Sequence, residues 1–353
     1  MREAKHIIGT DDVILVTGAT GYIGLKVVKT LLELGFRRLR CFVRPSSRQV
    51  ALMQMAGSFK GAQIEVVTGN LLSREDCHAA AEDVRVIYHL AAGTGQKSFA
   101  DAFMNSVVTT RNLLEASTQR QYLKRFVNVS SFAVYSNARE SGKRLLDEGC
   151  PIEKHPELRG EAYCFAKVKQ EQLVCEYCSS FGIPYVIVRP GAVYGPGKTY
   201  LTDRVGIDTF GIFLHIGGSN TIPLTYVDNC AEAIALAGLQ EGIDGEVFNI
   251  VDDDLPSSRQ FLRLYKKNVR RFRSLYVPPF VSYSLCYLWE KYSKFSEGQL
   301  PPAFNRKRWN AYWQKTNYSN GRLKTRVGWT QKVPTTEGLR RYFEGCRGAQ
   351  TNA

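Results

Sequence analysis

Val13-Ile-Leu-Val-Thr-Gly-Ala-Thr-Gly-Tyr-Ile-Gly24 joins a continuous apolar run to three glycines spaced three residues apart. The apolar run predicts a buried strand, and the periodic residues that follow predict a helix. In such a turn Gly18 permits the tight bend, Gly21 lets a pyrophosphate approach the backbone, and Gly24 lets the helix pack on the strand. The helix N-terminus offers unpaired N–H groups to the phosphates. The stretch therefore predicts a dinucleotide site, and it is not a P-loop because no Gly-Lys-Ser/Thr follows.

The first 190 residues alternate β-rich runs with helical patterns, which predicts an α/β protein with a doubly wound parallel sheet. We expect strands at residues 13–16, 39–43, 64–67, 84–90, 125–129, 185–188 and 247–250, and helices at 22–34, 98–117, 161–181 and 228–239. We assign residues 1–190 to a nucleotide-binding domain that carries the catalytic residues. Residues 191–353 are assigned mainly to a smaller substrate lobe, with 228–250 returning to the sheet. Residues 191–218 are rich in glycine and aromatic side chains, so we expect loops that line the substrate pocket.

The composition is that of an ordinary globular protein with a basic surface. The chain has 353 residues, 44% of them hydrophobic and 23% charged, and a formal net charge of +14. These values exclude a disordered, collagen-like or multi-span membrane chain. The positive charge favours anionic partners, and because no nucleic-acid recognition motif is present, we expect phosphate-bearing small molecules rather than nucleic acid.

Three features of the sequence bear on the location of the protein and on metal binding: its cysteines, its histidines and its N-terminus. The nine cysteines have no framework spacing, and the first apolar run is only four residues long. We therefore expect reduced thiols in a cytoplasmic protein without a signal peptide. The five histidines show no metal-ligand spacing, so we expect no metal, and His89 at a strand end is interpreted as a packed structural residue.

The end of the second predicted strand distinguishes NAD from NADP. An acidic residue there would bind the ribose 2′-hydroxyl of NAD, but residues 39–49 contain no Asp or Glu. Arg44 stands there instead, followed by Ser46, Ser47 and Arg48. A guanidinium can bind a 2′-phosphate through paired hydrogen bonds. We expect NADP as the preferred cofactor and NAD as the alternative. If these basic residues have no role in binding, they form a solvated surface loop.

Tyr163 and Lys167 lie four residues apart on the predicted helix 161–181, which places both side chains on one face. A free tyrosine has a pKa of about 10 and is a poor base at neutral pH. A neighbouring ammonium favours the phenolate, so Tyr163 could take a proton from an alcohol or give one to a carbonyl. Ser131, which follows the fifth predicted strand, could hold the same oxygen by a hydrogen bond. The Y-x-x-x-K spacing alone is common by chance, and in an arbitrary helix a surface tyrosine and lysine would be the better explanation of the pair.

Further motifs follow the glycine-rich stretch in order: His89-Leu-Ala-Ala92, Ser130-Ser-Phe-Ala-Val-Tyr135, Tyr163-Cys-Phe-Ala-Lys167, Arg189-Pro-Gly-Ala-Val-Tyr-Gly-Pro-Gly197, Tyr226-Val-Asp-Asn229 and Gly328-Trp329. With them the chain resembles an extended short-chain dehydrogenase/reductase. That group contains nucleotide-sugar epimerases and dehydratases, dihydroflavonol-type reductases and 3β-hydroxysteroid dehydrogenases. The resemblance implies a Rossmann-type sheet with a smaller C-terminal substrate lobe. Its motifs are specific to the superfamily and not to a substrate.

The resemblance also implies residue roles. It makes Ser131 the catalytic serine, Tyr163 the acid/base and Lys167 the residue that binds the nicotinamide ribose, and Asn105 matches the family's helix asparagine. Where the family shows Gly-Asp-Leu, this chain has Gly69-Asn-Leu71, so the usual adenine contact would fall to an asparagine carbonyl. The expected cofactor-binding residues are Gly18, Thr20, Gly21, Tyr22, Ile23, Gly24, Arg44, Asn70, Leu71, Ala91, Ala92, Lys167 and Pro190.

A second departure bears on the reaction. In the sugar 4,6-dehydratases the serine or threonine position is followed by Asp-Glu, which performs the elimination, whereas Ser131 is followed by Phe132 and Ala133. Neither can transfer a proton, so dehydration is not expected. Two reactions at a secondary alcohol or ketone remain open. In epimerisation the hydride leaves and returns to the other face; in net oxidation or reduction the cofactor exchanges.

The sequence motifs do not identify the substrate, and other features of the chain suggest two candidates. We expect an anionic nucleotide sugar and a homodimeric enzyme, and the basic C-terminal residues Arg271, Arg273, Arg306 and Arg308 could meet a diphosphate. The apolar segment 277–289 supports an alternative, a 3β-hydroxysteroid dehydrogenase-like or dihydroflavonol reductase-like enzyme on an apolar substrate, with a peripheral membrane contact. A third interpretation is an NADP(H)-sensing or scaffold protein, but such chains typically lose the tyrosine or the lysine that is present here.

Overall fold

Seven parallel strands form the central sheet, in the order β12-β7-β5-β4-β1-β2-β3. The computed structural model describes residues 6–351 apart from 48, 94–97, 119–121, 138–144, 200, 210, 298 and 300–303. The expected α/β fold with a doubly wound parallel sheet is confirmed. The strands of this sheet are β1 (Val13–Thr17), β2 (Arg38–Val43), β3 (Gln63–Thr68), β4 (Val84–His89), β5 (Arg125–Val129), β7 (Tyr185–Pro190) and β12 (Val247–Ile250).

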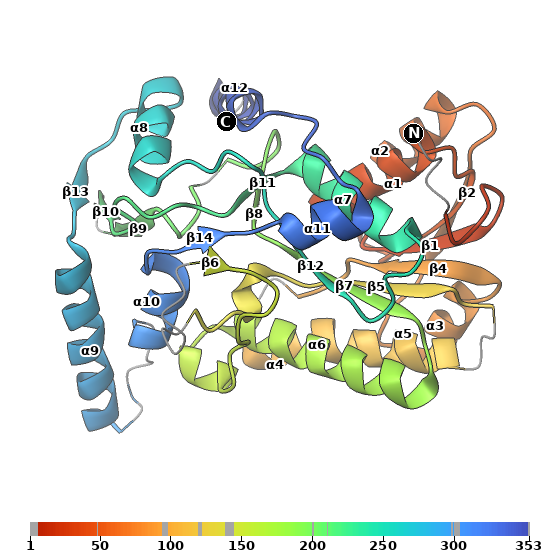
Figure 1. Cartoon of the computed structure of the whole chain (residues 1–353), viewed down its shortest axis with the longest axis horizontal. Coiled ribbons are helices and arrows are strands. Elements are labelled where there is room, and N and C mark those ends of the chain that lie inside the picture. The colour runs from red at the N-terminus through yellow and green to blue at the C-terminus, as the bar shows by residue number, and fades with distance from the viewer. Residues whose placement is uncertain are drawn as a thin grey trace.

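Helices cover both faces of the sheet (Figure 1). One face is packed by α1 (Tyr22–Glu33), α7 (Val227–Leu239) and α11 (Gly321–Val327), with α2 (Val50–Ser58) beside α1. The other face is packed by α3 (Arg74–Ala80), α5 (Thr109–Thr118) and α6 (Ala162–Phe181). The first strand shows the consequence: Ile14 and Val16 belong to the core under one layer, and Val13 and Leu15 to the core under the other. A strand covered on both sides needs a continuous apolar run, which is what its sequence has.

The helix expected at residues 98–117 is divided in the structure. It begins at α4 (Phe99–Phe103), where the Ser98 hydroxyl accepts a hydrogen bond from the Asp101 backbone N–H. A π-helical turn, Met104–Val108, then joins α4 to α5. A π turn takes up one extra residue in the hydrogen-bond ladder, so it does not interrupt the apolar periodicity enough to be seen in a sequence.

The segment expected to be loop-dominated, residues 191–218, contains three short strands, so that expectation is wrong in part. They are β8 (Ala192–Tyr194), β9 (Gly206–Thr209) and β10 (Ile212–His215). β8 pairs with β11 (Leu224–Tyr226), and β10 pairs with β9 and with β13 (Ser274–Tyr276). The remaining elements are two 3-10 turns (Phe132–Val134 and Pro156–Arg159), β6 (Leu145–Leu146), α8 (Ser258–Asn268), α9 (Pro279–Phe295), α10 (Arg306–Trp313), β14 (Asn317–Tyr318) and α12 (Thr335–Thr351).

The chain returns to the central sheet twice after residue 191. α7 packs on α1, and β12 extends the sheet beside β7. Later, Leu323, Val327 and Trp329, on and just after α11, join the same core as Val27 and Val28 of α1. The C-terminal residues therefore fall into two groups, one completing the sheet core and one lying beside the carboxyl ends of the strands (Figure 1).

Candidate active site

A cavity of about 510 Å³ opens at the carboxyl ends of the strands, beside the β1–β4 pair. At this pair the strand order reverses direction, and open α/β sheets bind ligands at such points. The walls come from the glycine-rich turn, the ends of β4, β5 and β7, the start of α6, and α10. The lining residues include Gly18, Gly21, Tyr22, Ile23, Gly24, Ala92, Ser131, Tyr163, Lys167 and Pro190. All three expected catalytic residues thus face one cavity together with the glycine-rich turn.

The glycine-rich turn has the shape that phosphates need. Gly18 has a φ of +70°, and a Cβ at Gly24 would lie 2.1 Å from the Gly18 carbonyl oxygen, so neither position tolerates a side chain. Helix α1 starts after Gly21, no side chain caps its first turn, and that turn holds no acidic residue. Its N–H groups are therefore left for a ligand, and the positive end of the helix dipole adds to their attraction for an anion. This cradle fits the pyrophosphate of a dinucleotide.

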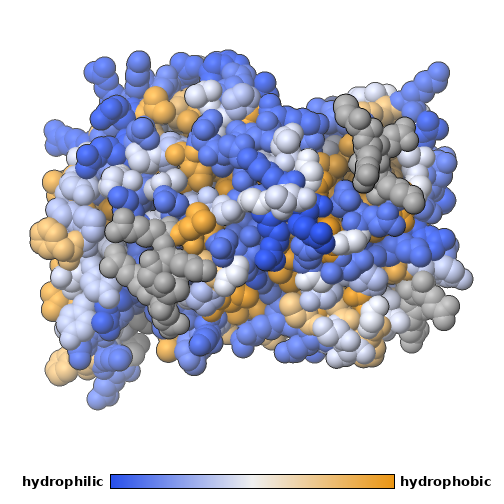
Figure 2. Space-filling model, viewed as in Figure 1, coloured by the Kyte–Doolittle hydropathy of each residue, from blue (hydrophilic) through white to orange (hydrophobic). Residues whose placement is uncertain are grey.

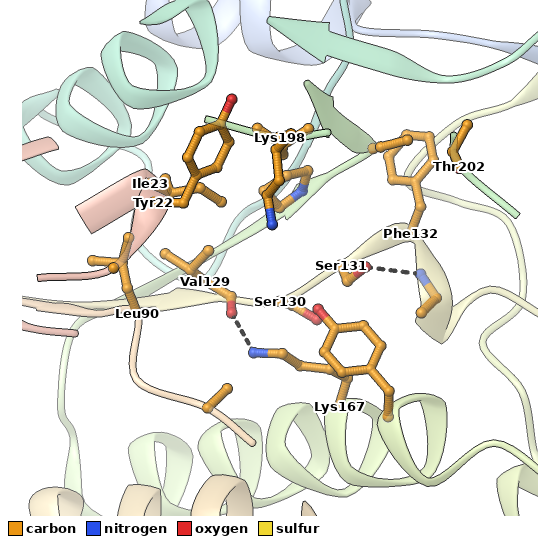
Figure 3. A pocket seen from close by; sticks show the side chains of 18 of the residues that line it. Tyr22, Ile23, Leu90, Val129, Ser130, Ser131, Phe132, Lys167, Lys198 and Thr202 are labelled. Atoms are coloured by element: carbon orange, nitrogen blue, oxygen red, sulfur yellow. Dashed lines mark hydrogen bonds between the residues drawn. The ribbon is translucent and has the colours of Figure 1, made fainter. Parts of the chain in front are cut away.

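Lys167 approaches the cavity from α6, one turn after Tyr163. Its Nζ donates to the Val129 carbonyl at 2.7 Å and to Gln170 Oε1 at 2.9 Å. Burial lowers the pKa of Lys167 to about 8, although Glu171 opposes this shift. Ser131 follows β5, and its hydroxyl accepts a hydrogen bond from the Ala133 N–H at 3.1 Å, which fixes the side chain at the cavity edge (Figure 3).

Behind Lys167 a chain of buried hydrogen bonds crosses the fold. Gln170 donates to Thr110 Oγ1 at 2.7 Å, Thr110 lies 2.8 Å from His89 Nε2, and His89 Nδ1 lies 2.8 Å from Thr17 Oγ1. Burial lowers the pKa of His89 to about 3, so the ring is neutral at physiological pH. The network links α6, α5, β4 and β1, and it holds Lys167 in register with the glycine-rich turn. His89 is a packed residue inside this network.

Several expected cofactor residues do not line the cavity. Leu71 is buried, and Asn70 is exposed with its side-chain oxygen accepting from the Leu72 N–H at 3.0 Å. Ala91 donates its N–H to Thr17 Oγ1, directly beside the turn. Thr20 is half-buried within the turn, and Arg44 is exposed at the carboxyl end of β2. Arg44 follows β2, and Asn70 and Leu71 follow β3, on the side of the sheet where the adenosine half of a dinucleotide would extend, whereas Ala91 follows β4.

Two further expectations complete this comparison. Asn105 stands in the π turn, and its side-chain amide donates to the Asp101 carbonyl and carboxylate rather than lining the cavity. Arg48 lies outside the described residues.

The opposite wall comes from the segment 191–218, which the sequence predicts to line the substrate pocket, and from Tyr312, which the sequence does not single out. Lys198, Thr202, Asp203, Arg204 and Tyr312 complete the cavity there. The Lys198 ammonium lies 5.0 Å from the centre of the Tyr22 ring and reaches into the cavity from the side opposite Lys167 (Figure 3). Arg204 packs 5.1 Å from the Tyr312 ring and donates to the Ala311 carbonyl. Lys198 and Arg204 give this wall a positive charge.

None of the four C-terminal arginines that could meet a diphosphate is among the residues that line this cavity. Arg306 forms an ion pair with Glu290 at 2.8 Å. Arg308 lies near Glu161 and Asp203 and lines a neighbouring cavity of about 420 Å³. Arg271 and Arg273 are exposed beside β13. Acidic neighbours hold Arg306 and Arg308, and the path of β13 places Arg271 and Arg273. The distribution of charges along the sequence predicts neither effect.

In the described part of the chain, no cluster of three or more His, Cys, Asp or Glu side chains is arranged to hold a metal ion. Across those same residues, no helix combines the length and the apolar character that crossing a membrane requires. All nine cysteines lie within the described residues, and none of them is paired in a disulfide.

Comparison with known proteins places the chain in a family. Residues 14–251 match the NAD dependent epimerase/dehydratase family. A trifunctional UDP-glucose 4,6-dehydratase/UDP-4-keto-6-deoxy-D-glucose 3,5-epimerase/UDP-4-keto-L-rhamnose-reductase of Arabidopsis thaliana is 27% identical over 249 residues, 67% of this chain and 36% of that protein. The 4-hydroxy-2-methyl-3-oxo-4-farnesyl-3,4-dihydroquinoline-1-oxide ketoreductase of Stigmatella aurantiaca is 28% identical over 253 residues, 70% of this chain and 71% of that protein. The match to the plant protein thus spans little more than a third of its length.

A solved structure supports the fold over nearly the whole chain. UDP-glucuronic acid 4-epimerase from Bacillus cereus, in complex with UDP-glucuronic acid and NAD, superposes with a TM-score of 0.69 and 22% identity, covering 96% of this chain and 99% of that one. The doubly wound sheet and the family match define a protein of the extended short-chain dehydrogenase/reductase type. The chain belongs to the NAD-dependent epimerase/dehydratase family.

Proposed function

We propose that this protein transfers a hydride at a secondary alcohol or ketone of a nucleotide sugar, with NADP(H) as its preferred cofactor. The observation that carries the proposal is the shared cavity. It brings Ser131, Tyr163 and Lys167 together with the glycine-rich turn on one side and with Lys198 and Arg204 on the other. A nicotinamide cofactor, when bound, would supply or accept the hydride.

Each catalytic residue has a defined task in this scheme. Tyr163 takes the proton from the substrate alcohol or returns it to the carbonyl. Ser131 is held by the Ala133 N–H, and its own O–H is directed to the same substrate oxygen. The Lys167 ammonium binds the nicotinamide ribose and favours the tyrosine phenolate. Phe132 and Ala133 line the same cavity without a group that can transfer a proton, so the scheme contains no elimination step.

The cofactor preference rests on the end of β2. Arg44 is exposed there, with Ser46 and Ser47 following it, and residues 39–49 contain no acid. A guanidinium and two hydroxyls can hold a 2′-phosphate, and the missing carboxylate removes the repulsion that NADP would otherwise meet.

The substrate class rests on charge. Lys198 and Arg204 line the same cavity as Tyr163, and in this proposal they bind the diphosphate of a substrate whose reacting carbon is beside Tyr163. Several relatives act on UDP-sugars by their names. The Stigmatella ketoreductase, which acts on a farnesylated quinoline oxide by its name, keeps reduction of an apolar ketone as the second candidate.

A panel of UDP-, GDP- and dTDP-sugars, incubated with and without added NADP⁺, tests the proposal. Epimerisation gives an inverted sugar without net NADPH, and a dehydrogenase accumulates NADPH in proportion to product. Tyr163→Phe should abolish either reaction while cofactor binding persists. Turnover of an apolar ketone with every nucleotide sugar inert would overturn the substrate class, and full activity in Tyr163→Phe would overturn the catalytic assignment.

A further inference from the structure

Helix α9 carries an apolar stripe that faces solvent. Five large residues recur at spacings of four and three, so they form one line along the helix. Val281 is half-buried, and the other four are mostly exposed: Leu285 56%, Leu288 59%, Tyr292 55% and Phe295 84%. A helix at the surface of a globular protein normally turns such a stripe to the core. In α9 the stripe is turned outward.

The adjoining face of α9, one residue further round the helix, holds it on the protein. Ser282, Cys286 and Ser293 are the buried residues of the helix. The Ser282 hydroxyl accepts from Trp309 Nε1 at 2.9 Å, and Glu290 forms an ion pair with Arg306, both partners belonging to α10. These contacts fix the orientation of α9. The fold therefore holds the apolar stripe toward solvent.

The apolar surface continues from α9 onto the strand before it. Leu275 and Tyr276 of β13 are exposed, as is Phe280 in the first turn of α9, which is 74% exposed. β13 and α9 follow one another along a single edge of the molecule (Figure 1), and hydrophobic side chains reach solvent along the same edge (Figure 2). Several large hydrophobic side chains exposed along one edge of a protein indicate a contact site.

Basic residues surround this apolar surface. Between residues 270 and 295 the basic side chains are Arg270, Arg271, Arg273, Lys291 and Lys294, all exposed. The same segment has one acid, Glu290, whose charge is neutralised by Arg306. Exposed leucine and aromatic side chains flanked by lysine and arginine are the composition of helices that lie in the headgroup region of a membrane. Their long stems can follow the apolar layer while their charges reach the phosphates.

We propose that β13 and α9 form a docking surface for an anionic lipid bilayer, with α9 lying in the plane of the headgroups. Charge complementarity favours this occupant. A second copy of the chain, with the same net charge of +14, would bring its own basic edge against this one, whereas anionic headgroups match it. The proposal stands on surface residues that do not line the active cavity, so it does not depend on the proposed function.

Vesicle co-sedimentation of the full chain tests the proposal. We expect binding to phosphatidylcholine vesicles that contain about a quarter phosphatidylglycerol, at least on the order of tenfold weaker binding to phosphatidylcholine alone, and release by salt. Leu285→Glu with Leu288→Glu should lower the partition coefficient by on the order of tenfold or more. Val50→Glu with Met53→Glu is the matched control, because these α2 side chains are equally exposed, at 66% and 57%, but lie on another surface.

The outcomes separate the possible occupants. Both substitution pairs replace exposed side chains, and unchanged thermal melting would verify that each variant folds. Binding that is lost in the α9 pair and retained in the α2 pair supports the proposal. No binding by the unmodified chain, or equal binding by both variants, overturns it. If sedimentation instead shows a dimer that the α9 pair dissociates, with no vesicle binding, the edge is an interface between copies and the bilayer proposal is wrong.

Discussion

Nζ of Lys167 lies 2.9 Å from Oε1 of Gln170, one turn further along α6, and both side chains are buried. The amide nitrogen of Gln170 donates to Thr110 Oγ1, so the amide is oriented from both ends and presents its oxygen to the lysine. An ammonium group can only donate hydrogen bonds, and an oriented acceptor therefore favours the charged form. Gln170 acts on the reaction through Lys167, as a positioning residue.

Substitution of Gln170 should move the pH profile of the enzyme. In Gln170→Leu the lysine loses an acceptor, so its pKa should fall below about 8 and the alkaline limb of kcat/KM should shift down by about one pH unit. In Gln170→Glu the added carboxylate should shift the same limb up. We expect kcat/KM at neutral pH to fall roughly tenfold in Gln170→Leu, as for one lost hydrogen bond to a charged group. Three superimposable pH profiles would mean that Gln170 only fills space.

Lys167 also ties stability to pH. Its pKa is lowered from an ordinary 10.5 to about 8 by burial, so between these values the unfolded chain holds a proton that the folded chain has released. Stability rises with pH wherever the unfolded state binds more protons. The Lys167 contribution to the free energy of unfolding should therefore increase from pH 8 upward, by about 1.4 kcal/mol per unit.

Denaturant unfolding of the wild type and of Lys167→Met, without cofactor, measures this contribution. Other lysines and tyrosines titrate in the same range, so the quantity to follow is the difference between the two proteins at each pH. It should change in favour of the wild type by up to about 2 kcal/mol between pH 8 and 9.5. A difference that does not vary with pH would contradict a lowered pKa for the buried lysine.

Arg44→Ala should remove the preference for NADP(H). A charge-assisted contact with a phosphate contributes about 1.5–3 kcal/mol, so NADPH affinity should fall by roughly one to two orders of magnitude while NADH affinity changes little. Arg37→Ala is the matched control, because it removes one exposed charge just before the other end of β2. Fluorescence titration with both cofactors measures the effect. Equal affinities for NADPH and NADH in the wild type would already be sufficient to reject the role of Arg44.

Lys198→Met should weaken the binding of an anionic substrate more than it slows the reaction. The side chain lies across the cavity from Lys167, away from the proton-transfer residues, so KM should rise about tenfold with kcat within about twofold. Added salt should narrow the difference between the two proteins because it screens the charge. Lys267→Met, an exposed substitution on α8, is the control for loss of one positive charge. An unchanged KM would remove Lys198 from the substrate site.

The sheet could be predicted because each of its strands carries a local signal. β1 is covered on both faces and therefore apolar throughout, and Gly24 is required by a contact with Gly18 that lies within the same turn. Tyr163, Lys167 and Ser131 could be predicted to meet because carboxyl ends of parallel strands share one edge. The π turn within 104–108 could not, since it alters the period by only one residue.

The opposite wall of the cavity depends on contacts between distant segments. Tyr312 reaches the cavity because α10 packs beside the cavity. The local sequence of α10 does not predict that position. The role of Arg306 was equally hidden, because its partner Glu290 lies on another helix. A signal did exist for Gln170: a polar residue three positions after Lys167, on the face of α6 that the fold buries.

The contact of Trp329 with the α1 side of the sheet core has a consequence for biosynthesis. Leu323, Val327 and Trp329 complete a cluster that Val27 and Val28 begin, so the earliest and the latest parts of the chain share one core. Because α11 packs on α7 and β12, that side of α7 stays uncovered during translation until residues 321–329 have left the ribosome. A chain arrested after β12 would contain every strand of the main sheet. It would still expose this uncovered apolar surface to chaperones and to other nascent chains.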